Sequence, residues 1–526
     1  MNGLQAFPTE VLNLIIEQLV LGIGIQKLVL LRTVNRAFDA SILHTICVSQ
    51  IVGIDDPATR GLAQRMPPWL RGKVLAVKSR SVTGADTSYL SVIARVNQSL
   101  DSLINEDEGM RTSRHEAVAG AVLLVQGEPV DHSVEALNIL SGAVVSGNLG
   151  VVASLLQQNE HSSIPVGVND TTPYFPNLLT LAATAGHLEM VRYLLGCGAR
   201  LHSVLSSPDY QRYRHQDLAT WHAQSEIIRS LTLHMKPRSA LRTAVFGGHG
   251  DIVHLFLRPE HRLPTDHVEY LSAIVAGAKA GRIDLIDALF EAIGKKLADM
   301  PGLENEMMWA ATRYNQQHVV QKLLDEGADI NAFPDEHIRP CHSALHIAAS
   351  LGNISMVRFL IERGADVHLN GVNSFGHLPI EGAARSGQKE VVELLIDEHG
   401  ADPASALHSA AKGCQSRLIK YLLERFPDLP FGNAGEDGYV AFLRALAGKN
   451  LRALTLLVEA GVDVNDDRFG VPYEEANNAG LGGWVCKHLI SLGARNSGGD
   501  TYRDEQNSHV RDVLVSERTW DWAGKY

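Results

Sequence analysis

The stretch QKLLDEGADIN at 321–331 recurs in near-duplicate form as RFLIERGADVH at 358–368, and SALHIAASLGNISMV at 343–357 lies between the two copies. Apolar residues in the second half of this stretch recur at helical spacing: Leu345, Ala348, Ala349, Met356, Val357, Leu360 and Ile361. Because Gly352-Asn353 interrupts them, the pattern predicts a short helix, a left-handed turn, a second helix and a loop that contains Gly-Ala-Asp. Neither helix can bury its apolar face alone, so a stack of such units is expected.

The residue at the helix–helix turn, called here the turn residue, can be followed along the chain. We place it at Gly147, Gly186, Gly248, Gly281, Asn315, Gly352, Gly387, Cys414, Lys449 and about Gly480. The successive gaps are 39, 62, 33, 34, 37, 35, 27, 35 and 31 residues. Most gaps are close to ~33 residues. Glycine suits a turn with positive φ and asparagine is next best, so cysteine and lysine are the least suitable residues in this set. The gap of 62 predicts a degenerate repeat or an insertion at 201–237.

Three segments resemble the ankyrin-repeat consensus: LLTLAATAGHLEMVRYLLGCGARL (178–201), SALHIAASLGNISMVRFLIERGADVH (343–368) and GAARSGQKEVVELLIDEHGADP (382–403). The resemblance covers about 137–496 and implies an all-α solenoid of about ten helix-turn-helix units, so we expect a repeat domain at 136–496 and a C-terminal tail at 497–526. The family's Thr-Pro-Leu-His start survives only as Leu345-His346 and Leu407-His408, and Arg242, Val275, Trp309 and Glu381 stand where its histidine would be. In Gly-Ala-Asp (327–329, 364–366, 400–402) and in Gly461-Val462-Asp463, the glycine is expected to end a helix and the aspartate to fix the loop.

The first 48 residues contain two helical runs, FPTEVLNLIIEQL (7–19) and KLVLLRTVNRAF (27–38). They resemble a fungal-type F-box. An F-box followed by ankyrin repeats is an arrangement that we associate with filamentous fungi. The residues that carry this resemblance are Phe7, Pro8, Glu10, Val11, Leu12, Leu31, Arg32, Asn35, Arg36 and Phe38. The resemblance implies docking to the Skp-type adaptor of cullin ubiquitin ligases through Phe7, Pro8, Val11, Leu12, Ile15 and Ile16. The alternative is a helical cap over the end of the solenoid.

Residues 49–135 are not recognisable as repeats. The segment 88–104 has the spacing of an amphipathic helix, and 115–125 is apolar enough to be buried. A flexible linker would be poorer in valine, leucine and isoleucine. We therefore expect a helical connecting or capping region here.

Composition excludes several classes of protein. The net charge of −12 argues against general nucleic-acid binding, which needs a basic surface. The five cysteines are far apart without a CxxC pair, which suits a reducing compartment and gives no zinc spacing. No apolar stretch has the length of a membrane span or the form of a clean signal peptide. We expect a cytoplasmic or nuclear protein that is not secreted.

Sequence motifs for common catalytic and cofactor sites are absent, so no cofactor or metal is expected. One enzyme-like row consists of His346, Glu381 and His408, which occupy the same place in three successive repeats. A carboxylate between two imidazoles could perform acid–base chemistry, in a small-molecule cyclase or isomerase for instance. The 201–237 segment would support it with Tyr210, Tyr213, His215, Trp221 and His222. The alternative reading is that the motif histidine connects neighbouring loops by hydrogen bonds.

A second row lies two residues before each turn residue, where the ankyrin family often contacts its partner in the concave groove. Its members are Val145, Thr184, Phe246, Lys279, Arg313, Ser350, Arg385 and Lys412. Tyr314 and Leu351 lie beside this row. Its basic residues could attract an acidic partner, or they could be placed there by the helix dipole alone. We predict a partner-binding groove formed by Phe246, Lys279, Arg313, Tyr314, Leu351, Arg385 and Lys412.

The sequence therefore predicts a protein–protein interaction scaffold. The F-box resemblance would make it the substrate-recognition subunit of a ubiquitin ligase. A plain intracellular scaffold with a capped N-terminus and an enzyme built in the groove stay open as alternatives.

Overall fold

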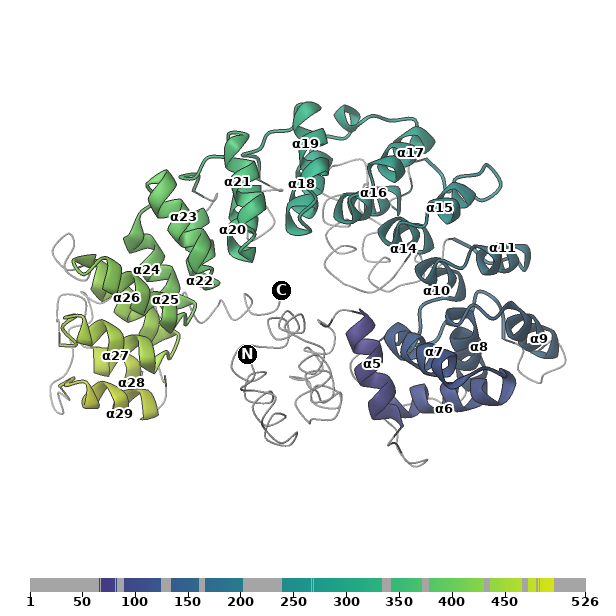
Figure 1. Ribbon diagram of the computed structural model, residues 1–526, viewed down its shortest axis with the longest axis horizontal. Coiled ribbons are helices and arrows are strands. Elements are labelled where there is room, and N and C mark those ends of the chain that lie inside the picture. Colours follow the sequence, from purple (N-terminus) through teal and green to yellow (C-terminus); the bar gives the residue numbers. More distant parts are fainter. Residues whose placement is uncertain are drawn as a thin grey trace, which may run out of the picture. The chain divides into compact units, whose positions relative to one another are not determined.

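A computed structural model describes residues 66–123, 134–159, 166–201, 239–333, 342–370, 378–429, 436–465, 472–478 and 481–495, apart from short gaps at 67, 81, 83–88, 266, 268 and 482. Every regular element in these ranges is helical, as predicted (Figure 1). The F-box-like segment 1–48, the residues 202–237 of the predicted excursion and the tail 497–526 lie outside the described residues. The chain divides into two compact units, Met1–Gly277 with Asp284–Gly294, and Ala278–Ile283 with Lys295–Tyr526.

The first unit begins with three helices and continues with helix pairs. The three helices are α5 (Pro68–Ser79), α6 (Tyr89–Leu103) and α7 (Glu108–Ala121). The pairs are α8 (Glu135–Val145) with α9 (Leu149–Asn159), α10 (Leu178–Ala185) with α11 (Leu188–Gly196), α14 (Ala240–Gly247) with α15 (Gly250–Phe256), and α16 (Glu269–Ala280) with α17 (Ile283–Ile293). The turn of the last pair, Ala278–Ile283, belongs to the second unit. The helix predicted at 88–104 is confirmed as α6.

The second unit consists of helix pairs after a short 3₁₀ helix, η5 (Leu297–Asp299). The pairs are α18 (Leu303–Arg313) with α19 (Gln317–Asp325), α20 (Ala344–Leu351) with α21 (Ile354–Glu362), α22 (Pro379–Arg385) with α23 (Lys389–His399), α24 (Pro403–Lys412) with α25 (Ser416–Arg425), α26 (Glu436–Ala447) with α27 (Leu451–Glu459), and α28 (Pro472–Asn478) with α29 (Gly483–Ser491). We call the first helix of each pair the inner helix and the second the outer helix.

The turn between the helices of a pair has the predicted left-handed backbone. All nine predicted turn residues within the described ranges have positive φ, including the three that are not glycine, namely Asn315 (60°), Cys414 (57°) and Lys449 (55°). The following residue closes the turn, because its backbone N–H bonds to the carbonyl five residues earlier, as in Gln388 N to Ala383 O at 2.9 Å. The register is thus confirmed from Gly147 to Lys449, and Gly480 lies outside the described residues.

Small residues let successive inner helices approach each other. The position four residues before the turn residue is alanine with no exposed surface in eight repeats: Ala143, Ala182, Ala244, Ala311, Ala348, Ala383, Ala410 and Ala445. In α16 the equivalent residue is Gly277, where an added Cβ would lie 2.7 Å from the side chain of Ile286. Within the second unit, the inner helices α18, α20, α22, α24, α26 and α28 pack in sequence order. Within the first unit, α6, α8, α10 and α14 do the same.

Outer helices bury one apolar stripe against this inner row. In α21 the stripe is Met356, Val357 and Leu360, which have no exposed surface. Full burial of such a side chain is worth roughly 1.5–3 kcal/mol relative to exposure. Each short helix pair therefore depends on its neighbours for stability, which is the physical reason for the stack.

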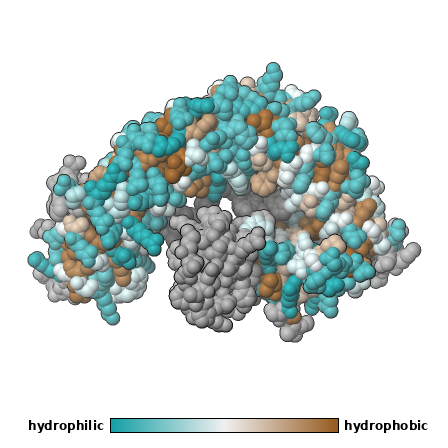
Figure 2. Space-filling model, in the orientation of Figure 1, coloured by the Kyte–Doolittle hydropathy of each residue, from teal (hydrophilic) through white to brown (hydrophobic). Residues whose placement is uncertain are grey.

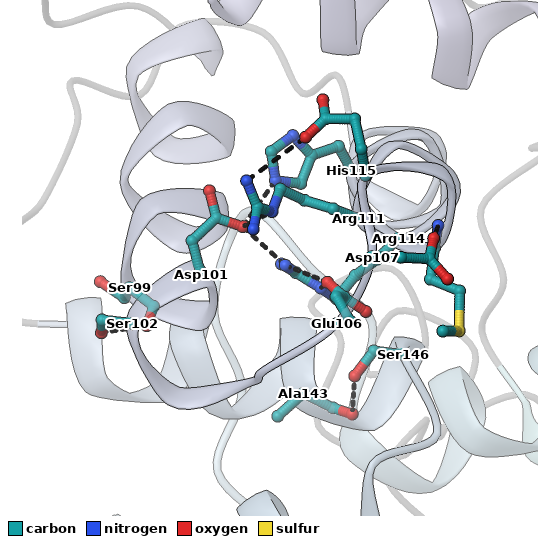
Figure 3. Close-up of polar contacts among 12 residues, drawn as sticks. Ser99, Asp101, Ser102, Glu106, Asp107, Arg111, Arg114, His115, Ala143 and Ser146 are labelled. Atoms are coloured by element: carbon teal, nitrogen blue, oxygen red, sulfur yellow. Dashed lines mark hydrogen bonds and ion pairs between the residues drawn. The ribbon is translucent and has the colours of Figure 1, made fainter.

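Helices α6 and α7 are held together by a partly buried cluster of charged side chains as well as by apolar packing (Figure 3). Arg114 on α7 is buried and donates from Nε to Glu106 Oε1 and from Nη2 to Asp101 Oδ1, both at 2.6 Å. His115 Nε2 also lies 2.9 Å from Asp101 Oδ1. Although burial alone would raise the pKa of the Asp101 carboxyl, the hydrogen bonds from His115 and Arg114 outweigh it and lower that pKa. Helices α6 and α7 both contact α8, so this cluster connects directly to the first helix pair.

Candidate functional site

The predicted groove residues lie at the C-terminal ends of inner helices. Arg313, Tyr314, Leu351, Arg385 and Lys412 come from α18, α20, α22 and α24 or directly follow them, and these helices are consecutive in the second unit (Figure 1). We call these five residues the turn-end row. The repeat places them together, because each is one or two residues before a positive-φ turn residue. Phe246, at the end of α14 in the first unit, is 49% exposed.

Aromatic rings hold two of the predicted cations. The guanidinium of Arg313 lies 5.3 Å from the centre of the Trp309 ring, one helical turn earlier on α18. The ammonium of Lys279 lies 6.0 Å from the centre of the Tyr314 ring. Lys279 is only 8% exposed, whereas Tyr314 is 43% exposed and Leu351 is 45% exposed. Tyr314 and Leu351 therefore present an apolar surface next to Arg313, and Lys279 contributes a charge from beneath this surface.

After five of the turns, the next residue fixes the backbone two residues before the turn of the preceding repeat, a contact that sequence reasoning missed. Its side chain donates to a backbone carbonyl of the preceding repeat, that of the residue two positions before the turn residue. The pairs are His187 Nε2 to Val145 O (3.1 Å), His249 Nε2 to Thr184 O (3.3 Å), Gln316 Nε2 to Lys279 O (3.0 Å), Gln388 Nε2 to Ser350 O (3.3 Å) and Gln415 Nε2 to Arg385 O (3.1 Å). The histidine or glutamine that recurs directly after the turn residue is the signal that could have revealed this contact.

This contact also explains where the turn residue must be glycine. A Cβ added at Gly352 would lie 2.4 Å from Gln388 Oε1, and one at Gly387 would lie 2.4 Å from Gln415 Oε1. After Asn315, by contrast, the next repeat has the shorter Asn353, which accepts from Met356 N of its own helix at 3.2 Å. The turn at Cys414 is followed in the next repeat by Asn450, which likewise accepts from Ala453 N at 3.2 Å. Gly352 and Gly387 are thus the turn residues against which the next repeat places a glutamine. Asn315 and Cys414 are the turn residues for which the next repeat has an asparagine at that position.

The enzyme-like row keeps its predicted register, since each member is six residues before a positive-φ turn residue. His346 is buried and its ring stacks on His342 at 4.0 Å between centres. Glu381 Oε2 accepts from Leu378 N at 3.2 Å and so caps its own helix, α22. Both contacts are typical of residues that support the fold. His408 is half-buried on α24.

The loops after the outer helices follow the predicted pattern and add a contact between repeats. Asp329, Asp366 and Asp463 each accept from the backbone N–H two residues later, at 2.8–2.9 Å. Asparagines then join one loop to the next. Asn331 donates to Gly364 O at 3.4 Å and accepts from Asp366 N at 2.9 Å. Asn465 repeats this arrangement with Gly493 and Arg495. The aspartate role was predicted, whereas the asparagine contact was missed.

One buried carboxyl group lies outside both predicted rows. Glu269 begins α16 and is 2% exposed. Burial raises the pKa of Glu269 to about 7, and the nearby Ser239 and Arg242 compensate only in part. Glu269 therefore keeps its proton to a higher pH than an ordinary glutamate does.

Among the described residues there is neither a candidate metal cluster nor a membrane-spanning helix. Figure 2 shows hydrophobic residues as small patches on a largely hydrophilic face. The described residues contain no group of three or more histidine, cysteine, aspartate or glutamate side chains that could hold a metal ion. They also contain no helix long and apolar enough to cross a membrane.

Comparison with known proteins identifies the repeats. A family model for ankyrin repeats in three copies matches residues 307–405, and a single ankyrin-repeat model matches 177–204. The chain is 26% identical over 298 residues to ankyrin repeat and KH domain-containing protein mask-1 of Caenorhabditis elegans, which covers 55% of this chain and 10% of that protein. It is 32% identical over 163 residues to palmitoyltransferase AKR1 of Lachancea kluyveri, which covers 29% and 22% respectively.

The chain therefore spans under a quarter of the length of either curated relative. Among solved structures, the human ASB11 ankyrin repeat domain matches with 22% identity and a TM-score of 0.29, over 40% of this chain and 96% of that one. Residues 177–204 and 307–405 are ankyrin repeats; they contain α10 and α11, the larger part of α18, and the helices from α19 to α23.

Proposed function

We propose that the chain is a protein–protein interaction scaffold whose repeat domain, residues 136–496, captures a protein partner on the turn-end row. The observation that carries this proposal is the gathering of three cations and two exposed apolar side chains on neighbouring inner helices. The chain as a whole is acidic, with a net charge of −12, so a local row of cations would favour an acidic partner. Phe246 would add an exposed apolar side chain, and Lys279 a cation, at the corresponding places in their own repeats.

We further propose that the fungal-type F-box-like segment, residues 1–48, connects this partner to a ubiquitin ligase through a Skp-type adaptor. Its motif residues, from Phe7 to Ile16, support this proposal. Residues 49–135 would then form the connecting region between adaptor and repeats, and residues 497–526 a separate tail.

Charge reversal tests the repeat surface. We expect the triple variant Arg313→Glu, Arg385→Glu and Lys412→Glu to lose proteins that the wild-type chain captures and that can be crosslinked to it. The matched control is Arg363→Glu, Arg417→Glu and Lys420→Glu, which changes the net charge equally at exposed positions on or at the end of outer helices. Equal capture by the two triple variants would exclude the row as the partner site.

Adaptor binding is tested separately. Co-purification of the full chain with a recombinant Skp-type adaptor should be lost on Leu12→Asp with Ile16→Asp. Capture of the repeat-bound partner should stay unchanged in that variant. If the wild-type chain does not bind the adaptor, the scaffold proposal survives and the N-terminal segment is better explained as a cap.

A further inference from the structure

The turn-end row has a repeat distance, and this distance restricts what can bind along it. Neighbouring packed helices lie about 8–10 Å apart. An extended peptide advances about 3.3–3.6 Å per residue, so one repeat corresponds to about three peptide residues. Arg313 and Arg385 are two repeats apart, and Lys412 is one repeat further.

Arg313 is the best-prepared cation in this row. Its guanidinium carbon lies over the Trp309 ring, 5.3 Å from the ring centre. A cation held over a ring face still has N–H donors that can bind a partner. Among the described residues, no carboxylate forms an ion pair with Arg313. A guanidinium edge in this arrangement suits two-point binding of a carboxylate from a partner.

The apolar part of the surface begins with Tyr314 in the repeat of Arg313 and continues with Leu351 in the next repeat. Leu351 follows Tyr314 in register, since each directly precedes a turn residue on neighbouring inner helices, and both are nearly half exposed. The row position between Arg313 and Arg385 is Ser350, which carries no charge and does not exclude an apolar side chain. An apolar residue between two acidic residues of a partner would therefore face Tyr314 and Leu351.

We propose that the partner is recognised through an extended segment with an acidic residue, an apolar residue about three positions away, and further acidic residues about six and nine positions away. In this order the segment contacts Arg313, the Tyr314–Leu351 surface, Arg385 and Lys412. This inference rests on the proposed function and specifies the chemistry of the partner. The spacing follows from the helix repeat, and the residue types follow from the row.

The test uses two fluorescent peptides of identical composition in a glycine–serine background, measured by anisotropy against the full chain. One has glutamate, leucine, glutamate and glutamate at intervals of three residues, and it is made in both chain directions. The other has the three glutamates adjacent and the leucine at one end. We expect the spaced peptide, in one direction, to bind about tenfold more tightly than the compact one, with affinity that falls as salt rises.

Single substitutions locate the contact. Arg313→Gln and Arg385→Gln should each weaken binding of the spaced peptide about threefold to fivefold. Lys420→Gln, which removes an exposed cation on α25, should not. Equal affinity for the two peptides, unaltered binding by both arginine variants, or absence of binding would each overturn the inference. The scaffold proposal fails separately, when the triple charge reversal leaves capture of natural partners unchanged.

Discussion

Helices α6 and α7 bury charged side chains between them, whereas helices α21 to α25 keep their charged pairs at the surface. Arg114 and Glu106 have side chains that are 4% and 13% exposed. By contrast, Arg358 and Glu398, which join α21 to α23, are 49% and 45% exposed. Between α20 and α25, alanines and backbone-directed side chains occupy the places where helices meet.

The difference shows that the chain uses two ways to position helices. A buried ion pair depends on every one of its members, because a lone buried charge is costly. A contact from a side chain to a backbone carbonyl can recur with different residues, since every residue offers the same carbonyl. The repeats can therefore vary their exposed row residues while keeping the fold, which suits a surface that binds a partner.

Removal of Arg114 should have the largest effect. We expect Arg114→Met to destabilise α6 and α7 by about 3–5 kcal/mol, because Glu106, whose side chain is 13% exposed, would keep its charge in a largely buried place. Hydrogen exchange of the α6 and α7 amides measures this change locally.

The matched control is Arg111→Met on the same helix. Arg111 is 41% exposed and pairs with the exposed Glu108, so its removal should cost less than about 1 kcal/mol. Similar costs for the two variants would mean that burial of the charge is not what distinguishes this region.

Glu269 should give the first unit a pH dependence at neutral pH. Its pKa is about 7 in the folded protein and 4.5 for the ordinary group, so the folded state holds the proton more tightly. Its contribution to stability is fully present below about pH 4.5 and is lost as the pH rises through about 7, a difference of about 3 kcal/mol. Urea unfolding followed by circular dichroism, near pH 5 and near pH 8, measures this loss.

The variant Glu269→Gln should show little of that loss, because an amide does not ionise. Glu189→Gln, at an exposed position of the same unit, should retain the pH dependence of the wild type. A wild-type protein with equal stability at both pH values would contradict the role assigned to Glu269.

Substitution of two glycines with positive φ, one in a loop and one at a helix–helix turn, should separate backbone strain from crowding by a neighbouring side chain. Alanine at Gly364 meets no atom within 4 Å, so Gly364→Ala should cost only the positive-φ strain, about 1–2 kcal/mol. Gly352→Ala carries the same strain and also displaces Gln388 from Ser350 O, which adds about 1 kcal/mol. In a Gln388→Ala background, the cost of Gly352→Ala should fall to that of Gly364→Ala. If the costs of Gly352→Ala and Gln388→Ala simply add in the double variant, crowding between these two side chains is excluded.

The sequence was sufficient for features that repeat locally and insufficient for features that depend on a neighbour. Turn residues as unsuitable as Cys414 and Lys449 were placed correctly, because the helical periodicity on either side defines the turn. The contact of Gln388 was missed because it depends on the distance between repeats. The burial of Lys279 was also missed, since its surroundings include the Tyr314 ring of the next repeat and cannot be read from its place in the row.

The smallest predicted effect is a gain of stability at the turn that breaks the glycine pattern. Cys414 has φ of 57°, and its sulfur lies 3.6 Å from Gly448 O, a weak contact. Cys414→Gly should therefore stabilise the second unit by up to about 1 kcal/mol, because relief of the positive-φ strain exceeds the loss of that contact. Lys449→Gly should act in the same direction, and urea unfolding measures both. A loss of stability in both variants would mean that these side chains stabilise their turns, so the backbone alone would not explain why glycine recurs elsewhere.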